Sequence, residues 1–122
     1  MRRFFLMSAL VGVLPLFGCG NTPLHTLGKP IANAPVAVVA SLLPVAAKLP
    51  ERPIALHGTM VEKCPASGCW LRIRDTSGTI KVDLRASGTT ATDIPTGTEM
   101  TVSGTPVRVG DESVLQASGL TY

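Results

Sequence analysis

The part of the chain from Ile54 to Tyr122 consists of short runs in which apolar and polar residues alternate. Turn-forming residues separate these runs, as in Thr76-Ser77-Gly78 and Val109-Gly110-Asp111-Glu112. Alternation with a period of two is typical of half-buried β-strands, and glycine and aspartate between the runs are typical of turns. This pattern predicts an all-β domain.

Five such runs are present, and their lengths and connections favour one kind of barrel. They cover residues 54–64, 69–75, 79–84, 98–109 and 112–122. Gly58 lies inside the first run, where glycine usually marks a bulge or a sharp bend. A bent first strand and a long third connection are typical of a five-stranded OB-like barrel. That connection, residues 85–97, has no helix-forming face, so we expect a loop or a single turn there.

The segment before the barrel predicts one short helix, at about residues 35–44. Pro35 suits the first position of a helix, and Pro44 would end it. Four apolar residues between them recur at helical spacing and would share one face. They are Val36, Val39, Leu42 and Leu43.

The N-terminus has the pattern of an export signal. Arg2 and Arg3 precede an apolar run that ends at Gly18-Cys19. A basic start, a short apolar region and a small residue before the cysteine indicate a lipoprotein signal at residues 1–18, with palmitate or a similar acyl chain on Cys19. An ordinary signal cleaved beyond Cys19, or an uncleaved anchor, is the alternative. Residues 19–34 would form a tether, ordered from about Leu27, and residues 35–122 the barrel domain with its leading helix.

This signal implies attachment to a bacterial membrane through the lipid, on the periplasmic face. Gly20 and Asn21 lack the aspartate that resembles an inner-membrane retention signal, which favours the outer membrane. The whole chain carries a net charge of +3, of which Arg2 and Arg3 contribute two units. Since the remaining excess is small, bulk charge argues against a nucleic-acid partner. An envelope protein, a glycan or a small anion is the expected partner.

Cys64 and Cys69 enclose a Pro-Ala-Ser-Gly turn, and the third cysteine, Cys19, is assigned to lipid. Opposed positions of antiparallel strands lie about 4.5–5.5 Å apart, within the reach of a disulfide. Disulfides persist outside the cytoplasm. We therefore expect a Cys64–Cys69 disulfide that staples the hairpin.

Two other roles for this pair stay open. Thiolates bind Cu(I) or Zn(II), and Met60 or His57 could complete a copper or zinc site, although zinc normally takes four ligands. Thiol–disulfide exchange is the second role, with Lys63 favouring the Cys64 thiolate. The spacing is longer than in thioredoxin-like motifs, and a strand follows the pair instead of a helix.

One face of the second and third runs combines an aromatic ring with cations. Alternation places Trp70, Arg72 and Arg74 on the same side, and Lys81 joins them from the next strand. OB folds bind ligands on this surface through aromatic stacking and charge. The alternative is an ordinary solvated face on which Asp83 offsets the arginines.

Motifs for enzymatic catalysis are lacking in the sequence. It has no Gly-x-Ser-x-Gly, no His-Glu-x-x-His and no phosphate-binding glycine loop. Its acidic residues are scattered in turns and on outward strand positions. We therefore expect a binding or interaction module that requires no cofactor.

The stretch GTMVEKCPASGCW, residues 58–70, resembles the signature of a family of small exported bacterial OB-fold proteins of unknown function. That signature reads Gly-Thr-Val, then Cys-x-x-x-Gly-Cys-Trp. Met60 and Lys63 depart from it, where valine is more usual. The resemblance implies an exported OB-like barrel and gives no activity. The matching residues are Gly58, Thr59, Cys64, Gly68, Cys69 and Trp70.

Overall fold

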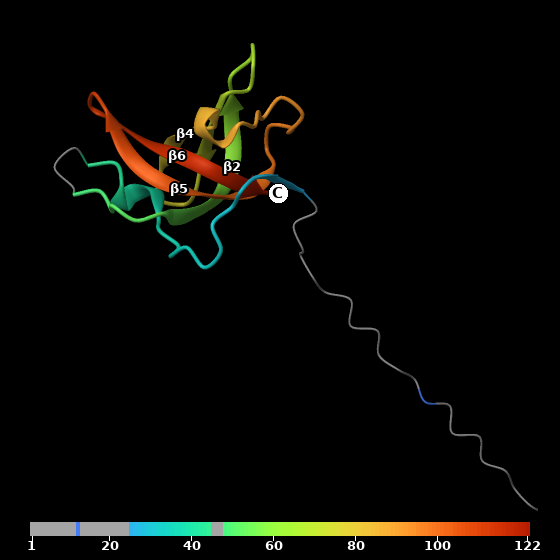
Figure 1. Ribbon diagram of the computed structural model, residues 1–122, viewed down its shortest axis with the longest axis horizontal. Coiled ribbons are helices and arrows are strands. Elements are labelled where there is room, and N and C mark those ends of the chain that lie inside the picture. Colours follow the sequence, from blue (N-terminus) through green and yellow to red (C-terminus); the bar gives the residue numbers. More distant parts are fainter. Residues whose placement is uncertain (1–11, 13–24, 45–47) are drawn as a thin grey trace, which may run out of the picture.

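The computed structural model describes residue 12, residues 25–44 and residues 48–122 (Figure 1). Cys19 and the predicted signal, apart from Gly12, lie outside these residues. Among the described residues, no helix is both long and apolar enough to cross a membrane. The strands are β1 (Thr26–Gly28), β2 (Ile54–Lys63), β3 (Trp70–Arg74), β4 (Thr79–Asp83), β5 (Glu99–Val109) and β6 (Glu112–Thr121).

Strands β2 to β6 form a closed barrel, which confirms the predicted OB-like fold. The sheet order is β1-β6-β4-β3-β2-β5, and β5 also pairs with β6. All these pairings are antiparallel except β4 with β6, which run parallel over residues 81–83 and 114–116. Figure 1 shows the long β5–β6 hairpin curving across the barrel.

Two glycines allow strands to approach closely where the barrel bends. β2 pairs with β5 as far as Thr59 and with β3 from Thr59 onward, with a register shift between Met60 and Glu62. A Cβ atom on Gly58 would lie 2.7 Å from the carbonyl oxygen of Arg74. In β5 the register shifts beside Gly104, whose Cβ would collide with the carbonyl oxygen of Gln116. Such shifts are β-bulges, which bend strands in small barrels.

The alternating apolar residues fill the barrel. Inward positions of all five barrel strands are buried, and the burial of apolar side chains is the main stabilising contribution to such a fold. The largest fully buried side chains are Leu42, Leu56, Met60, Leu71, Ile73, Ile80, Leu84, Ile94, Met100, Leu115, Leu120 and Val39.

The helix predicted at residues 35–44 is wrong: only a single 3-10 turn, η1 (Val39–Ser41), forms there. Val36 makes an isolated parallel bridge with Ala55 of β2, so the sheet takes the main-chain groups that a helix would need. Val39 and Leu42, two of the four residues predicted to share a face, are buried. Val36 is 77% exposed, because its extended main chain directs its side chain to solvent.

The connection between β4 and β5 is a loop with a single turn, as expected. The link after β4 contains one 3-10 turn, η2 (Arg85–Ser87), as its sequence predicts. Within the range predicted as a tether, Thr26–Gly28 form β1 and pair with residues 119–121 of β6.

Candidate functional site

Three of the residues predicted to share one face, Trp70, Arg72 and Lys81, come together there, whereas Arg74 lies at the edge of a groove. Trp70 and Arg72 point outward from β3, and Arg72 lies opposite Lys81 of β4. The guanidinium carbon of Arg72 is 5.9 Å from the centre of the Trp70 ring, and Lys81 Nζ is 5.3 Å from it. Two cations thus contact the one tryptophan.

Acidic neighbours offset the charge of this face. The guanidinium of Arg72 lies 3.7 Å from the Glu62 carboxylate and 3.3 Å from that of Glu112. Asp83, opposite Trp70, forms an ion pair of 2.6 Å with Arg85. Hydrogen bonds from the Arg85 side chain hold the pKa of Asp83 below its usual value. The Trp70 face is therefore largely neutralised by its own residues, and exposed pairs of this kind add little stability.

Cys64 and Cys69 are both half-buried free thiols in the structure. The Cys64 N–H donates to the carbonyl of Trp70, so Cys64 lies opposite Trp70 and not opposite Cys69. The register shift between Met60 and Glu62 sets this alignment. Since successive side chains on a strand point to opposite faces, Cys69 does not face Cys64 across the hairpin. The Cys64–Cys69 disulfide therefore stays a prediction.

The turn after Cys64 stabilises its thiolate. Hydrogen bonds from the main-chain N–H of Ser67 and Ala66, and from the Ser67 hydroxyl, lower the pKa of Cys64 to about 6. The Cys64 Sγ and Ser67 Oγ atoms are 3.8 Å apart. This pKa favours the thiolate, the reactive form of cysteine, at neutral pH.

Alkylation by iodoacetamide should detect this thiolate. We expect the rate at Cys64 to rise through a midpoint near pH 6, well below the value of about 8.5 for an unperturbed cysteine. Ser67→Ala removes one of the hydrogen bonds and should move the midpoint upward, while Cys69→Ser should leave it in place. Mass spectrometry of peptides quenched across a pH series measures both rates. A Cys64 midpoint near 8.5 would contradict the hydrogen-bonded turn.

Lys63 has a different role from the one suggested by its place beside Cys64. Its Nζ atom donates hydrogen bonds to the carbonyls of Ala91, Thr92 and Ile94, at 3.4, 2.9 and 2.6 Å. The Ala91 N–H in turn donates to the Gly68 carbonyl at 2.8 Å. Lys63 therefore joins the cysteine turn to the 91–94 loop, and the thiolate is stabilised by the turn itself.

The other predicted metal ligands lie away from the cysteines. Met60 is fully buried in the barrel core. His57 is seven residues before Cys64, at most about 23 Å away along the bent β2, and its Nδ1 atom contacts the Thr101 hydroxyl at 3.0 Å. In the part of the chain that the structure describes, no three or more His, Cys, Asp or Glu side chains gather as a metal site.

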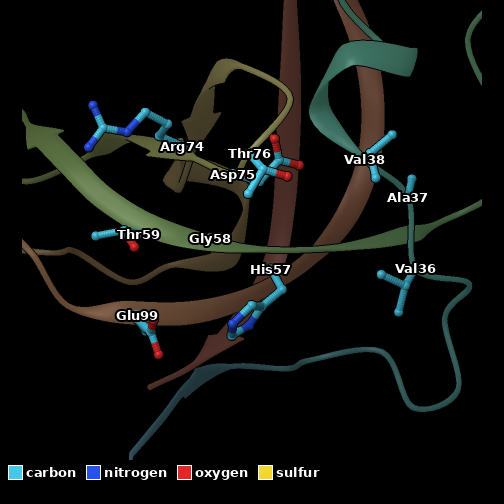
Figure 2. Close-up of a pocket in the computed structure, with 10 residues that line it drawn as sticks. All are labelled: Val36, Ala37, Val38, His57, Gly58, Thr59, Arg74, Asp75, Thr76 and Glu99. Carbon is cyan, nitrogen blue, oxygen red and sulfur yellow. The ribbon is translucent and has the colours of Figure 1, made fainter.

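A groove that sequence reasoning missed lies on another side of the barrel (Figure 2). Its volume is about 580 Å³. β2 crosses its middle, the segment before η1 borders one side, and the end of β3 with the following turn borders the other. The groove is lined by Val36, Ala37, Val38, His57, Gly58, Thr59, Arg74, Asp75, Thr76 and Glu99.

The groove exposes main-chain groups of β2. Ala55 donates its N–H to Pro35 and accepts from Ala37, both at 2.9 Å, so its main-chain groups face away from β5. Along an antiparallel strand every second residue faces the same side, so the groups of His57 point that way too. The pairing of β3 with β2 ends at Thr59, which is in register with Arg74, the last residue of β3. Among the described residues, nothing hydrogen-bonds the N–H or the C=O of His57.

Asp75 takes the main-chain donor that could continue the sheet beside His57. A regular parallel ladder would continue from Ala37 with the Val39 N–H donating to the His57 carbonyl. Instead the Val39 N–H donates to a carboxylate oxygen of Asp75 at 2.9 Å. The other carboxylate oxygen accepts hydrogen bonds from Ser77 and Gly78. Partial burial acts to raise the pKa of Asp75, but these hydrogen bonds outweigh it and the pKa lies below its usual value.

The charges beside the groove lie on both sides of Thr59. Arg74 of β3 and Glu99 of β5 are each in register with Thr59. Because neighbouring strands lie about 4.8 Å apart, their Cα atoms are roughly 10 Å from each other. Both side chains are exposed, and neither has an ion pair within residues 25–44 and 48–122. The apolar side of the groove is formed by Val36 and Val38, which are 77% and 54% exposed.

Comparison with known proteins supports the architecture. No protein-family model matches the chain, and no curated protein sequence matches it. A solved structure described as the hypothetical protein YgiW from E. coli is similar, with a TM-score of 0.53 and 17% sequence identity. The match covers 78% of this chain and 98% of that one. The likeness establishes the fold. It supports the small OB-like barrel implied by the family resemblance, and at this identity it carries nothing about function.

Proposed function

We propose that this protein is a binding module of the bacterial envelope that is held at the membrane by a lipid on Cys19 and binds its ligand in the groove beside His57. The observation that carries the proposal is the groove itself, where exposed valines, unpaired charges and open main-chain groups meet. Such a combination of an apolar wall with a few polar groups is typical of ligand sites. Labelled palmitate incorporation that persists in Cys19→Ala would refute the anchor.

The groove is a better candidate than the Trp70 face. Arg72 already contacts Glu62 and Glu112, so a ligand there would have to displace existing ion pairs. Arg74, in contrast, is exposed at the edge of the groove and forms no ion pair within the described part of the chain. An incoming anionic group can therefore bind Arg74 without breaking an ion pair.

Chemical-shift mapping of the isotope-labelled full chain in detergent micelles tests this function. The probes are citrate as a small anion, chitotriose as a glycan and acetyl-Glu-Val-Thr-Val-Glu-amide as a protein segment. We expect saturable shifts at the groove residues with at least one probe. Arg74→Glu should weaken that binding by about tenfold or more, whereas the matched reversal Lys81→Glu on the Trp70 face should leave it unchanged. Absence of groove shifts with all three probes would refute the proposal.

A second candidate function rests on the lowered pKa of Cys64. A thiolate at neutral pH favours thiol–disulfide exchange or binding of a soft ion such as Cu(I), for which the Cys69 side chain would have to turn toward Cys64. Met60 and His57 would take no part in such a site, since one is buried in the core and the other lies far along β2. Elemental analysis of the purified protein distinguishes this candidate from the first.

A further inference from the structure

We propose that the groove binds an extended peptide segment, which adds to β2 as a short strand paired with His57. This inference rests on the proposed function and specifies its ligand. The segment would occupy the gap in the sheet between the stretch 35–37, which bonds Ala55, and the end of β3, which pairs with Thr59.

The main-chain groups of His57 carry the argument. Its N–H and C=O both point into the groove and need one acceptor and one donor placed side by side. In an antiparallel peptide one residue supplies both, and in a parallel peptide the two residues that flank the partner position supply one each, as Pro35 and Ala37 do for Ala55. An inorganic anion offers only acceptors and would leave the carbonyl without a donor.

The surroundings of the groove determine which peptide fits. Arg74 lies at the end of the gap, on the side of β2 where the added strand would run, so it would pair with an acidic side chain. Glu99 lies across β2, on the opposite strand β5. Val36 and Val38 offer exposed apolar surface to β-branched side chains of the peptide. The segment is therefore acidic at its end and β-branched in its middle.

The peptide acetyl-Glu-Val-Thr-Val-Glu-amide has this composition in both chain directions, so it can place a glutamate beside Arg74 whichever way it runs. With the isotope-labelled full chain in micelles, we expect saturable binding and hydrogen exchange at the His57 amide that is slowed about tenfold or more. In the free protein this amide should exchange faster than its bonded neighbours Leu56 and Gly58, because it has no acceptor.

Two matched variants distinguish the contribution of the His57 main chain to peptide binding from that of its imidazole. His57→Pro removes the N–H that faces the groove, and it should leave the fold intact because that N–H takes no part in the ladder with β5. We expect this variant to lose peptide binding by about tenfold or more. His57→Ala keeps the N–H and should bind as the natural chain does.

N-methylation of the peptide gives a test that needs no protein variant. Only one peptide N–H can donate to the His57 carbonyl, so methyl groups placed singly on the three central residues should weaken binding about tenfold at one of them and much less at the other two. An equal effect at all three positions, unchanged His57 exchange on binding, or no binding of the peptide would overturn this inference. Groove shifts with citrate or chitotriose alone would overturn it and leave the proposed function standing.

Discussion

Replacing Gly104 by alanine should destabilise the barrel by about 3 kcal/mol or more. At this position β5 bulges and its backbone approaches β6 so closely that a Cβ atom would collide with the carbonyl oxygen of Gln116 and lie 2.8 Å from the Ala117 Cα. Both obstacles are main chain, so no side-chain rotation relieves the collision. For a domain of about 100 residues the melting temperature should fall by roughly 12 °C or more, measured by circular dichroism.

Gly110 provides the matched control in the same hairpin. It has a φ of 63°, and a Cβ atom there would meet nothing within 4 Å. Gly110→Ala therefore costs only the left-handed conformation, about 1 kcal/mol. If Gly104→Ala melted within a few degrees of Gly110→Ala, the close approach of β5 and β6 at the bulge would be wrong.

The barrel was predictable because its signals are local. Alternation along the strands, exemplified by Leu71 and Ile73, determines which side chains point inward, and both are fully buried. Gly58 marked the bend of β2 for the same reason, since a glycine inside an apolar strand needs a local cause. These signals depend on sequence neighbours and are visible without any knowledge of tertiary contacts.

The segment before the barrel was not predictable in this way. Val39 and Leu42 are spaced as on a helix and are both buried, so periodicity alone favours a helix. Pairing of Val36 with Ala55, nineteen positions away, decides the outcome instead. Tertiary contacts of this kind override weak local propensity, particularly where β-branched residues already disfavour a helix.

Long-range pairing also determines the candidate sites. Cys64 lies opposite Trp70 because of a bulge several residues earlier in β2. Lys63 contacts carbonyls about thirty residues away. Beside the groove, a carboxylate after β3 accepts a hydrogen bond from Val39. The sequence did contain a signal for the Asp75 turn, since Asp75-Thr76-Ser77-Gly78 predicts a turn in which the aspartate side chain accepts hydrogen bonds. The hydrogen bond from the Val39 N–H to Asp75 could not be predicted from the sequence.

Asp75→Ala should close the groove and remove peptide binding. The Val39 N–H loses its acceptor in this variant, and the His57 carbonyl becomes the nearest continuation of the parallel ladder. We expect slower hydrogen exchange at His57 and at least a tenfold loss of affinity for the acetyl-Glu-Val-Thr-Val-Glu-amide probe. The loss of four hydrogen bonds in a largely exposed turn should lower stability by about 1–2 kcal/mol. Ser87→Ala, which removes a hydroxyl bonded to Leu84 and Thr89 in the η2 turn, is a control for a lost turn hydrogen bond away from the groove.

Acid should weaken the Val39–Asp75 hydrogen bond in the natural chain. Because the folded pKa of Asp75 is lowered, its contribution to stability is complete above its unfolded pKa of about 3.9 and is lost as the pH falls through the lower folded value. Exchange at the Val39 amide, measured against pH, should therefore accelerate relative to other core amides only below about pH 4. In Asp75→Ala this acid-dependent step should be absent. A step that persisted in the variant, or peptide affinity that survived the substitution, would show that Asp75 does not hold the groove open.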